Sequence, residues 1–231
     1  SAAVDMFKRD YNADIVSASY GWSAAAQCDI IGCNSSTAYV HRVNVEYLKL
    51  SLMGMTLVAS SADSGATGRT NEDCRRDPPD QTTRAPFPSS SPYVLSVGGT
   101  VQQQASHNYT WKTPLCQQAT CANVTGGSRA AMNDQVGWCS GSGFSPFTEA
   151  LDIQKPFVED YLSSGIGVPR HFPLYGRSTP DVSLNAHQCA TYIGGMLQGV
   201  DGTSCSAPGF AGLLAIVNDH QLKNNRPKLG F

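Results

Sequence analysis

The chain has 231 residues, of which 41% are hydrophobic and 15% are charged, a composition typical of a globular domain rather than a disordered chain. Its 16 basic and 18 acidic residues give a formal charge of −2 and form no long runs, which argues against a nucleic-acid or membrane-surface partner. The apolar stretches are far shorter than the roughly 20 residues that cross a bilayer, so we expect no membrane span.

Short apolar runs that end in small residues alternate with stretches whose apolar residues recur at a helical period. The runs, which predict buried strands, are 14–21, 55–60 and 93–97, the last closed by a Gly-Gly pair. The predicted helices are 39–52, 155–163 and 208–220, the last with Pro near its first turn. This order predicts a single α/β domain over residues 1–231, with a mainly parallel sheet and helices on both faces. Loops or hairpins rich in Cys, Gly and Pro would decorate it over 71–92 and 101–143.

The eight cysteines form an even set without the paired CxxC spacing of zinc sites, so we expect disulfides that staple the loops. Cys28 and Cys33 stand five residues apart, as do Cys116 and Cys121, which is close enough to close small loops. Spacing alone does not choose among the possible pairings.

Acceptor sites for N-linked glycans occur at Asn34, Asn108 and Asn123, each in polar, turn-rich surroundings. Together with the even cysteine set they favour the secretory pathway. We therefore expect a secreted or lysosomal/vacuolar glycoprotein.

The most informative segment is 199–208, Gly-Val-Asp-Gly-Thr-Ser-Cys-Ser-Ala-Pro, which precedes an apolar helix. Its small residues allow a sharp turn that leaves the hydroxyl of Ser204 exposed at or near the start of the helix. Unpaired N–H groups and the helix dipole favour negative charge developing there, as beside a nucleophile. Taken alone, Gly-Thr-Ser favours a helix cap.

Two motifs together resemble those of a peptidase family. The run Gly-Thr-Ser-x-Ser-x-Pro before a helix resembles the nucleophile motif of the subtilisin-like superfamily. Residues 61–66, Ser-Ala-Asp-Ser-Gly-Ala, resemble the Ser-Gly-Asp-Ser-Gly-Ala motif of the sedolisins, the serine-carboxyl peptidases, with Ala62 in place of Gly. Further matches occur in family order at 17–21, 87–93, 96–100, 137–145 and 180–183.

The resemblance implies acid-acting hydrolysis of peptide bonds on a subtilisin-like α/β fold. In the family's scheme Ser204 attacks the scissile carbonyl and forms an acyl-enzyme, while protonated Asp63 donates a hydrogen bond to the oxyanion. One carboxyl group must then act as an ionised base while another stays neutral, which restricts activity to the acid range.

A peptide or protein substrate is implied to lie extended along the chain. It would add main-chain hydrogen bonds beside Ser19, Tyr20 and Gly21 and near Gly98 and Gly99, as in strand addition. Glycine at such positions allows the two backbones to approach closely.

The family's Glu base and orienting Asp lie on one helix before the first strand, and this chain has no Glu-x-x-x-Asp helix there. Glu46, Glu149 and Glu159 are expected on solvated faces. The chain also ends before the region where the family binds calcium. We therefore expect the larger part of a cleaved or two-chain enzyme, completed by a second chain of the same precursor. It would hold no metal or other cofactor itself, and any calcium would bind in the absent C-terminal region.

Two other functions are compatible with parts of this pattern. A non-catalytic sedolisin-like glycoprotein with a binding or structural role would also lack the Glu/Asp helix, but Ser204 and Asp63 together favour the enzyme. A His-dependent subtilisin is disfavoured because none of the five histidines has a His-Gly-Thr context. We expect Cys205 to be half of a disulfide, and Asp181 to be a structural residue that pairs with Arg177.

Overall fold

The structure is a computed structural model that describes residues 13–67, 74, 85–109, 121–132, 136–165, 167–168 and 172–230. Over 102–109 and 121–127 the backbone alone is described. None of the helices in these ranges combines the length and apolar character that a membrane span requires.

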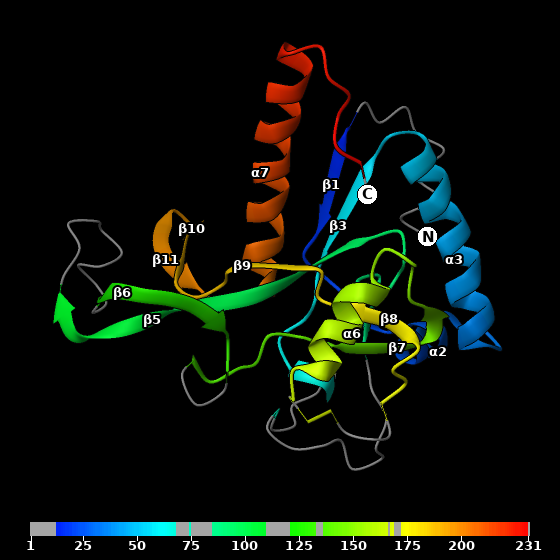
Figure 1. Ribbon diagram of the computed structural model, residues 1–231, viewed down its shortest axis with the longest axis horizontal. Coiled ribbons are helices and arrows are strands. Elements are labelled where there is room, and N and C mark those ends of the chain that lie inside the picture. Colours follow the sequence, from blue (N-terminus) through cyan, green and yellow to red (C-terminus); the bar gives the residue numbers. More distant parts are fainter. Residues whose placement is uncertain are drawn as a thin grey trace.

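The main sheet in the described ranges has five strands (Figure 1). They are β1 (Ile15–Ala18), β3 (Thr56–Ser60), β5 (Leu95–Tyr109), β6 (Cys121–Ala130) and β9 (Val182–Asn185). β3 lies parallel to both β1 and β5, and β9 is also parallel to β5. Only the β5–β6 pair in this sheet is antiparallel, so the prediction of a mainly parallel sheet is confirmed.

Helices cover both faces of this sheet (Figure 1) because successive side chains of a strand point to opposite sides. The two covering helices are α3 (Ser36–Leu52) and α7 (Thr203–Lys223). Val58 packs against Ala207 of α7, whereas its neighbour Leu57 packs on the other side in a cluster with Leu50 of α3. Full burial of a leucine such as Leu50 contributes about 1.5–3 kcal/mol, which makes these contacts a main source of cohesion.

All three predicted helices are present, but two of them begin earlier than the sequence pattern indicated. α6 (Lys155–Ser163) has the predicted bounds, and α3 begins three residues before the predicted residue 39, where the Ser35 hydroxyl accepts from the N–H of Ala38. α7 begins at Thr203 rather than at the predicted Pro208, which therefore lies inside the helix. This earlier start brings Ser204 into the first helical turn.

The remaining elements are short. They are β2 (Trp22–Ser23), α2 (Ala24–Ile31), the 3₁₀ helix η1 (Gly65–Thr67), β4 (Pro86–Phe87), β7 (Gly143–Glu149), β8 (Gly176–Thr179), β10 (Cys189–Ile193) and β11 (Met196–Val200). β10 and β11 form a hairpin outside the predicted elements. Its turn residues Gly194 and Gly195 have φ of 59° and 83°, the positive values that a tight type I′ turn requires.

β5 does not end at its Gly-Gly pair, as the sequence pattern indicated, but continues to Tyr109. A Cβ at Gly98 would lie 2.7 Å from Pro180, and a Cβ at Gly99 would lie 2.8 Å from the ring of Trp138. The two glycines therefore allow neighbouring segments to pack closely on the strand instead of ending it.

Three described disulfides staple the loops, and they are Cys28–Cys33, Cys74–Cys139 and Cys189–Cys205. The first confirms the small loop expected from spacing, and the third confirms that Cys205 is half of a disulfide. Cys116 lies outside the described residues, so its pairing with Cys121 stays a prediction.

The glycan sites differ in how much the structure says of them. Asn34 is exposed between α2 and α3, where a glycan has room. Asn108 and Asn123 lie in β5 and β6, and their side chains are outside the described part of the chain. Occupancy of these sites stays a prediction.

Arg177 is fully buried and its Nη2 lies 2.6 Å from Oδ2 of Asp181. The guanidinium also donates to the carbonyls of Ser91 and Val94, while Asp181 accepts from the backbone N–H of Ser96. Burial lowers the pKa of Arg177, and the charge of Asp181 opposes that shift. The structural role expected for Asp181 is confirmed, because its carboxylate neutralises a buried cation.

The prediction that Glu46 faces solvent is wrong, since only 3% of its surface is exposed. Arg42 and Lys49, four residues before and three residues after it on α3, donate to its carboxylate and lower its pKa. A sequence pattern does not show this burial, because charged residues on a helix usually mark its solvated face. Glu149 and Glu159 are exposed, as expected.

Candidate active site

Ser204 is the second residue of α7, and its side chain is exposed. The chain enters the helix through Gly202, which is buried and has a φ of 123°, a conformation that residues with a Cβ rarely adopt. This turn presents the Ser204 hydroxyl at the N-terminal end of a 21-residue helix. The free N–H groups and the dipole of such an end stabilise an anion beside it.

Asp63 follows β3 and lies against the same turn. Its Oδ1 accepts two hydrogen bonds from Thr203, one from the backbone N–H at 2.6 Å and one from the hydroxyl at 2.9 Å. A Cβ at Gly202 would come within 3.0 Å of Oδ2 of Asp63, so glycine leaves room for the carboxyl group. The two predicted catalytic residues thus meet through Thr203, the residue that precedes Ser204.

The segment that carries Asp63 is fixed by its backbone. Ala62 has a φ of 75°, which explains why glycine suits this position in the motif it resembles and why a small residue stands here. The N–H of Cys139 donates to the carbonyl of Asp63 at 3.3 Å, and the N–H of Gly141 donates to that of Ala62 at 2.6 Å. A Cβ at Gly141 would collide with the carbonyl of Ser61, so this close approach requires glycine.

Ser19, Tyr20 and Gly21 lie just beyond the end of β1, where the first two are exposed. The Ser19 hydroxyl donates to the carbonyl of Ser204 at 2.8 Å, and the Ser204 hydroxyl donates to the carbonyl of Ser19 at 3.2 Å. The predicted substrate-binding segment is therefore adjacent to the candidate nucleophile. Tyr20 is 60% exposed, which leaves much of its ring accessible.

Gly98 and Gly99 lie differently, because both are buried in β5. They pair with Ser183 and Leu184 of β9, and the N–H of Gly99 donates to the Ser140 hydroxyl at 2.9 Å. Close packing therefore accounts for glycine at these positions, and a role in substrate binding stays a prediction.

Asp201 forms a cluster that the sequence pattern did not reveal. Its Oδ2 is 2.8 Å from Nδ1 of His187 and accepts from the indole N–H of Trp138 at 3.3 Å, while Oδ1 accepts from the N–H of Gln188. The carboxylate thereby ties the turn before Ser204 to two other segments. His187 is only 34% exposed in its side chain, so it is a bonded rather than a free surface residue.

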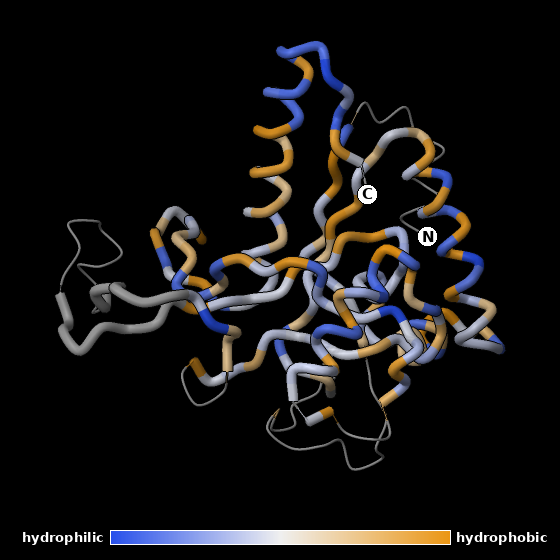
Figure 2. Tube along the Cα trace, viewed as in Figure 1, coloured by the Kyte–Doolittle hydropathy of each residue, from blue (hydrophilic) through white to orange (hydrophobic). Residues whose placement is uncertain are grey.

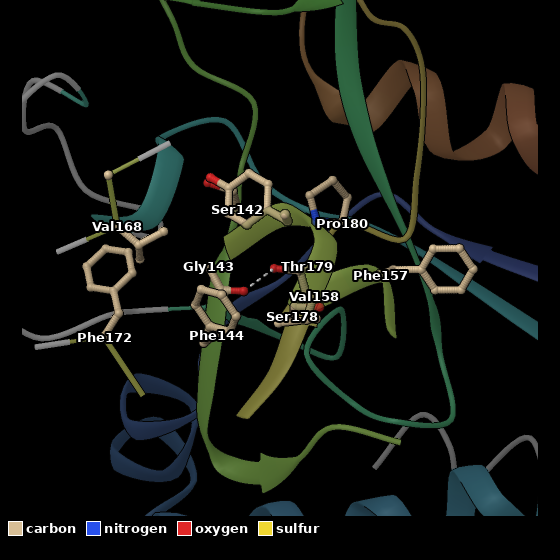
Figure 3. A pocket seen from close by; sticks show the side chains of 12 residues that line it. Ser142, Gly143, Phe144, Phe157, Val158, Val168, Phe172, Ser178, Thr179 and Pro180 are labelled. Carbon is tan, nitrogen blue, oxygen red and sulfur yellow. Dashed lines mark hydrogen bonds between the residues drawn. The ribbon is translucent and has the colours of Figure 1, made fainter. Parts of the chain in front are cut away.

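A cavity of about 370 Å³ lies between β7, β8 and α6 (Figure 3). Phe144 and Phe172 meet edge to face in its wall, with ring centres 6.5 Å apart, and Phe157 also lines it. Ser142 also lines the cavity, and its N–H donates to the carbonyl of Gly65, which lies two residues after Asp63. Its mostly apolar walls suit an apolar side chain or ring.

Within the described ranges, no group of three or more His, Cys, Asp and Glu side chains could hold a metal ion. The Ser204 hydroxyl donates to the carbonyl of Ser19, and no carboxylate of the described residues is bonded to it. The arrangement therefore offers a hydroxyl at a helix end and a nearby carboxyl group, but not the base that would activate the hydroxyl.

Comparison with known proteins reveals peptidase relatives, although no protein-family model matches the chain. The chain is 34% identical over 225 residues to physarolisin of Physarum polycephalum, covering 94% of this chain and 39% of that protein. It is 34% identical over 199 residues to tripeptidyl-peptidase 1 of Rattus norvegicus, and equally so to that of Homo sapiens, covering 85% of this chain and 30% of each relative. The chain thus spans less than half the length of these relatives.

A solved structure of similar fold is a Pseudomonas sedolisin, a serine-carboxyl proteinase complexed with two molecules of pseudo-iodotyrostatin. It superimposes with a TM-score of 0.61 at 26% identity, over 100% of this chain and 52% of the other. The subtilisin-like α/β fold expected from the resemblance is therefore confirmed.

Proposed function

Because the chain belongs to the sedolisin family of serine-carboxyl peptidases, we propose that it is part of an acid-acting peptidase with Ser204 as nucleophile and Asp63 as oxyanion donor. The observation that carries this proposal is the pair of hydrogen bonds from Thr203 to Oδ1 of Asp63. These bonds hold the Asp63 carboxyl group against Thr203, the residue that precedes Ser204. Asp63 and Thr203 are 140 positions apart in the sequence, so the fold, not chain proximity, brings them together.

The proposed reaction at these positions is the scheme that the family resemblance implies. The Ser204 Oγ attacks the scissile carbonyl carbon while its proton passes to a general base, and the carbonyl oxygen becomes an anion. Collapse of this intermediate breaks the C–N bond, and the amine leaves with a proton. Water then hydrolyses the ester on Ser204 and releases the acid. We propose two hydrogen-bond sources for the anion. One is the first turn of α7, apart from the N–H groups of Thr203 and Cys205, which already donate to Asp63 and Gly202, and the other is a protonated Asp63.

We propose that Oδ2 is the donor oxygen of a neutral Asp63, because Oδ1 already accepts two hydrogen bonds from Thr203. A neutral Asp63 is required together with an ionised base, and these two states coexist only in the acid range.

The general base must come from outside the described residues, and we propose a carboxylate on a segment of the same precursor, either cleaved or continuous. Any calcium is proposed to bind in a C-terminal region of the same precursor, as the family resemblance implies. Disulfides on three described loops support a secreted or lysosomal/vacuolar location. The substrate class is a peptide or protein.

The alternative is a non-catalytic sedolisin-like glycoprotein with a binding or structural role, which needs no base beside the Ser204 hydroxyl. Activity of the full-length protein distinguishes the two. We expect wild type to cleave peptides between about pH 3 and about pH 6, Ser204→Ala to be inactive but folded, and the exposed Ser164→Ala to match wild type. No cleavage by folded wild type would favour the binding protein.

A further inference from the structure

Pro208 leaves one carbonyl of α7 without its helical partner. In an α-helix the N–H of each residue donates to the carbonyl four residues before it, and proline has no N–H. Pro208 lies inside α7, and the carbonyl four residues before it belongs to Ser204. The carbonyl of Ser204, the proposed nucleophile, is therefore the carbonyl near the start of α7 that receives no bond from a residue four positions later.

Ser19 supplies the missing hydrogen bond. Its hydroxyl donates to the carbonyl of Ser204 at 2.8 Å, although 185 residues separate the two in the chain. The Ser204 hydroxyl donates in return to the carbonyl of Ser19 at 3.2 Å. This reciprocal pair fastens the first turn of α7 to the end of β1, and β1 is itself paired along its length with β3.

We propose that Ser19 is a positioning residue whose hydroxyl replaces the helical bond removed by Pro208 and so fixes the direction in which Ser204 presents its Oγ. The inference rests on the proposed peptidase function, and it differs from substrate binding by Ser19, because the hydroxyl acts on the nucleophile's backbone. Loss of the hydroxyl frees the Ser204 peptide to tilt, while the Ser19 carbonyl remains in place. A misdirected nucleophile lowers the rate of the chemical step more than it changes binding.

Three variants of the full-length protein test this inference. Ser19→Ala removes one hydrogen bond, and we expect a roughly three- to tenfold lower kcat with little change in KM. Ser19→Thr keeps the hydroxyl and should recover most of the rate. Pro208→Ala restores the helical N–H, so the double variant Ser19→Ala/Pro208→Ala should be closer to wild type than Ser19→Ala alone. Pro208 is exposed, and its replacement by alanine removes little packing.

Two measurements separate the outcomes. The rate at which a small phosphonylating probe labels Ser204 should follow kcat across the variants, since the probe occupies no extended peptide site. Thermal unfolding should show that each variant is folded. A Ser19→Ala variant with unchanged kcat or with a change in KM alone overturns the inference, as does a double variant no faster than Ser19→Ala. Failure of wild type itself to cleave peptides or take the probe would overturn the proposed function first.

Discussion

Replacing Asp63 separates its structural role from its chemical one. Asp63→Ala leaves the N–H and hydroxyl of Thr203, a fully buried residue, without their acceptor. Each buried donor without a partner costs about 1–3 kcal/mol, or about 2–6 kcal/mol for both. Because Asp63 is itself exposed, water enters part of the vacated space, and we expect the lower end of that range. Asp63→Asn keeps Oδ1 as acceptor and should lose far less stability.

The same pair of variants reports on catalysis. Loss of one oxyanion donor costs about 2.7–4 kcal/mol of transition-state stabilisation, so Asp63→Ala should be about 10²–10³-fold slower. In Asp63→Asn the amide N–H₂ stands where Oδ2 was and donates at every pH. It should therefore be more active than the alanine variant, and the alkaline limb of its pH profile should move upward.

Chemical denaturation gives the free energies of unfolding, and kcat/KM against pH gives the profiles. Equal losses of stability in the two variants would show that the bonds from Thr203 do not matter for the fold. A folded and active Asp63→Asn variant with the pH profile of wild type would remove Asp63 from the mechanism.

Three further predictions concern the fold. Leu50 lies in the core between α3 and the sheet, and Leu50→Ala should lower the free energy of unfolding by about 2–5 kcal/mol in denaturation experiments. Leu52 is 78% exposed on the same helix, and the control Leu52→Ala should change that free energy by less than about 0.5 kcal/mol. Arg177→Met leaves the partly buried Asp181 without its cation and should cost about 3–5 kcal/mol by the same assay, and a loss below about 1 kcal/mol would contradict the network. Alkylation of the unreduced native protein should label no cysteine, and peptide mass analysis should find sugar on at least one predicted site, with exposed Asn34 the first to inspect.

The sequence pattern predicted those elements whose formation depends on the apolar residues of the segment itself. The strands β1 and β3 and the helix α6 follow from runs and periods of apolar residues that lie within the segment itself, although only β3 is fully buried and β1 is partly exposed. Hydropathy along the chain shows the same alternation of apolar strands and mixed helices in Figure 2. The start of α7 was misplaced because proline usually opens a helix, whereas here tertiary contacts of Ser204 offset its missing hydrogen bond.

The candidate site was predictable only in part for a similar reason. Its two principal residues lie in short motifs, and the structure brings them together. The contacts that position them, from Thr203 to Asp63 and from Ser19 to Ser204, join segments at least 140 residues apart. The bond between His187 and Asp201 spans only 14 positions, but no local period marks two polar residues that meet across a hairpin. Burial of Glu46 was missed because Arg42 and Lys49 stand near it in the sequence, and a group of charged residues on a helix usually indicates an exposed face.

The central claim is that Ser204 is a nucleophile, and covalent labelling tests it most directly. Full-length protein from its native source would be treated in the acid range with a phosphonylating serine-peptidase probe, digested and mapped by mass. We expect an adduct on the peptide that contains Ser204, and slower labelling of the Asp63→Ala variant because its oxyanion donor is gone. An adduct on another residue, or an unlabelled Ser204 in protein that is folded and cleaves peptides, would contradict it.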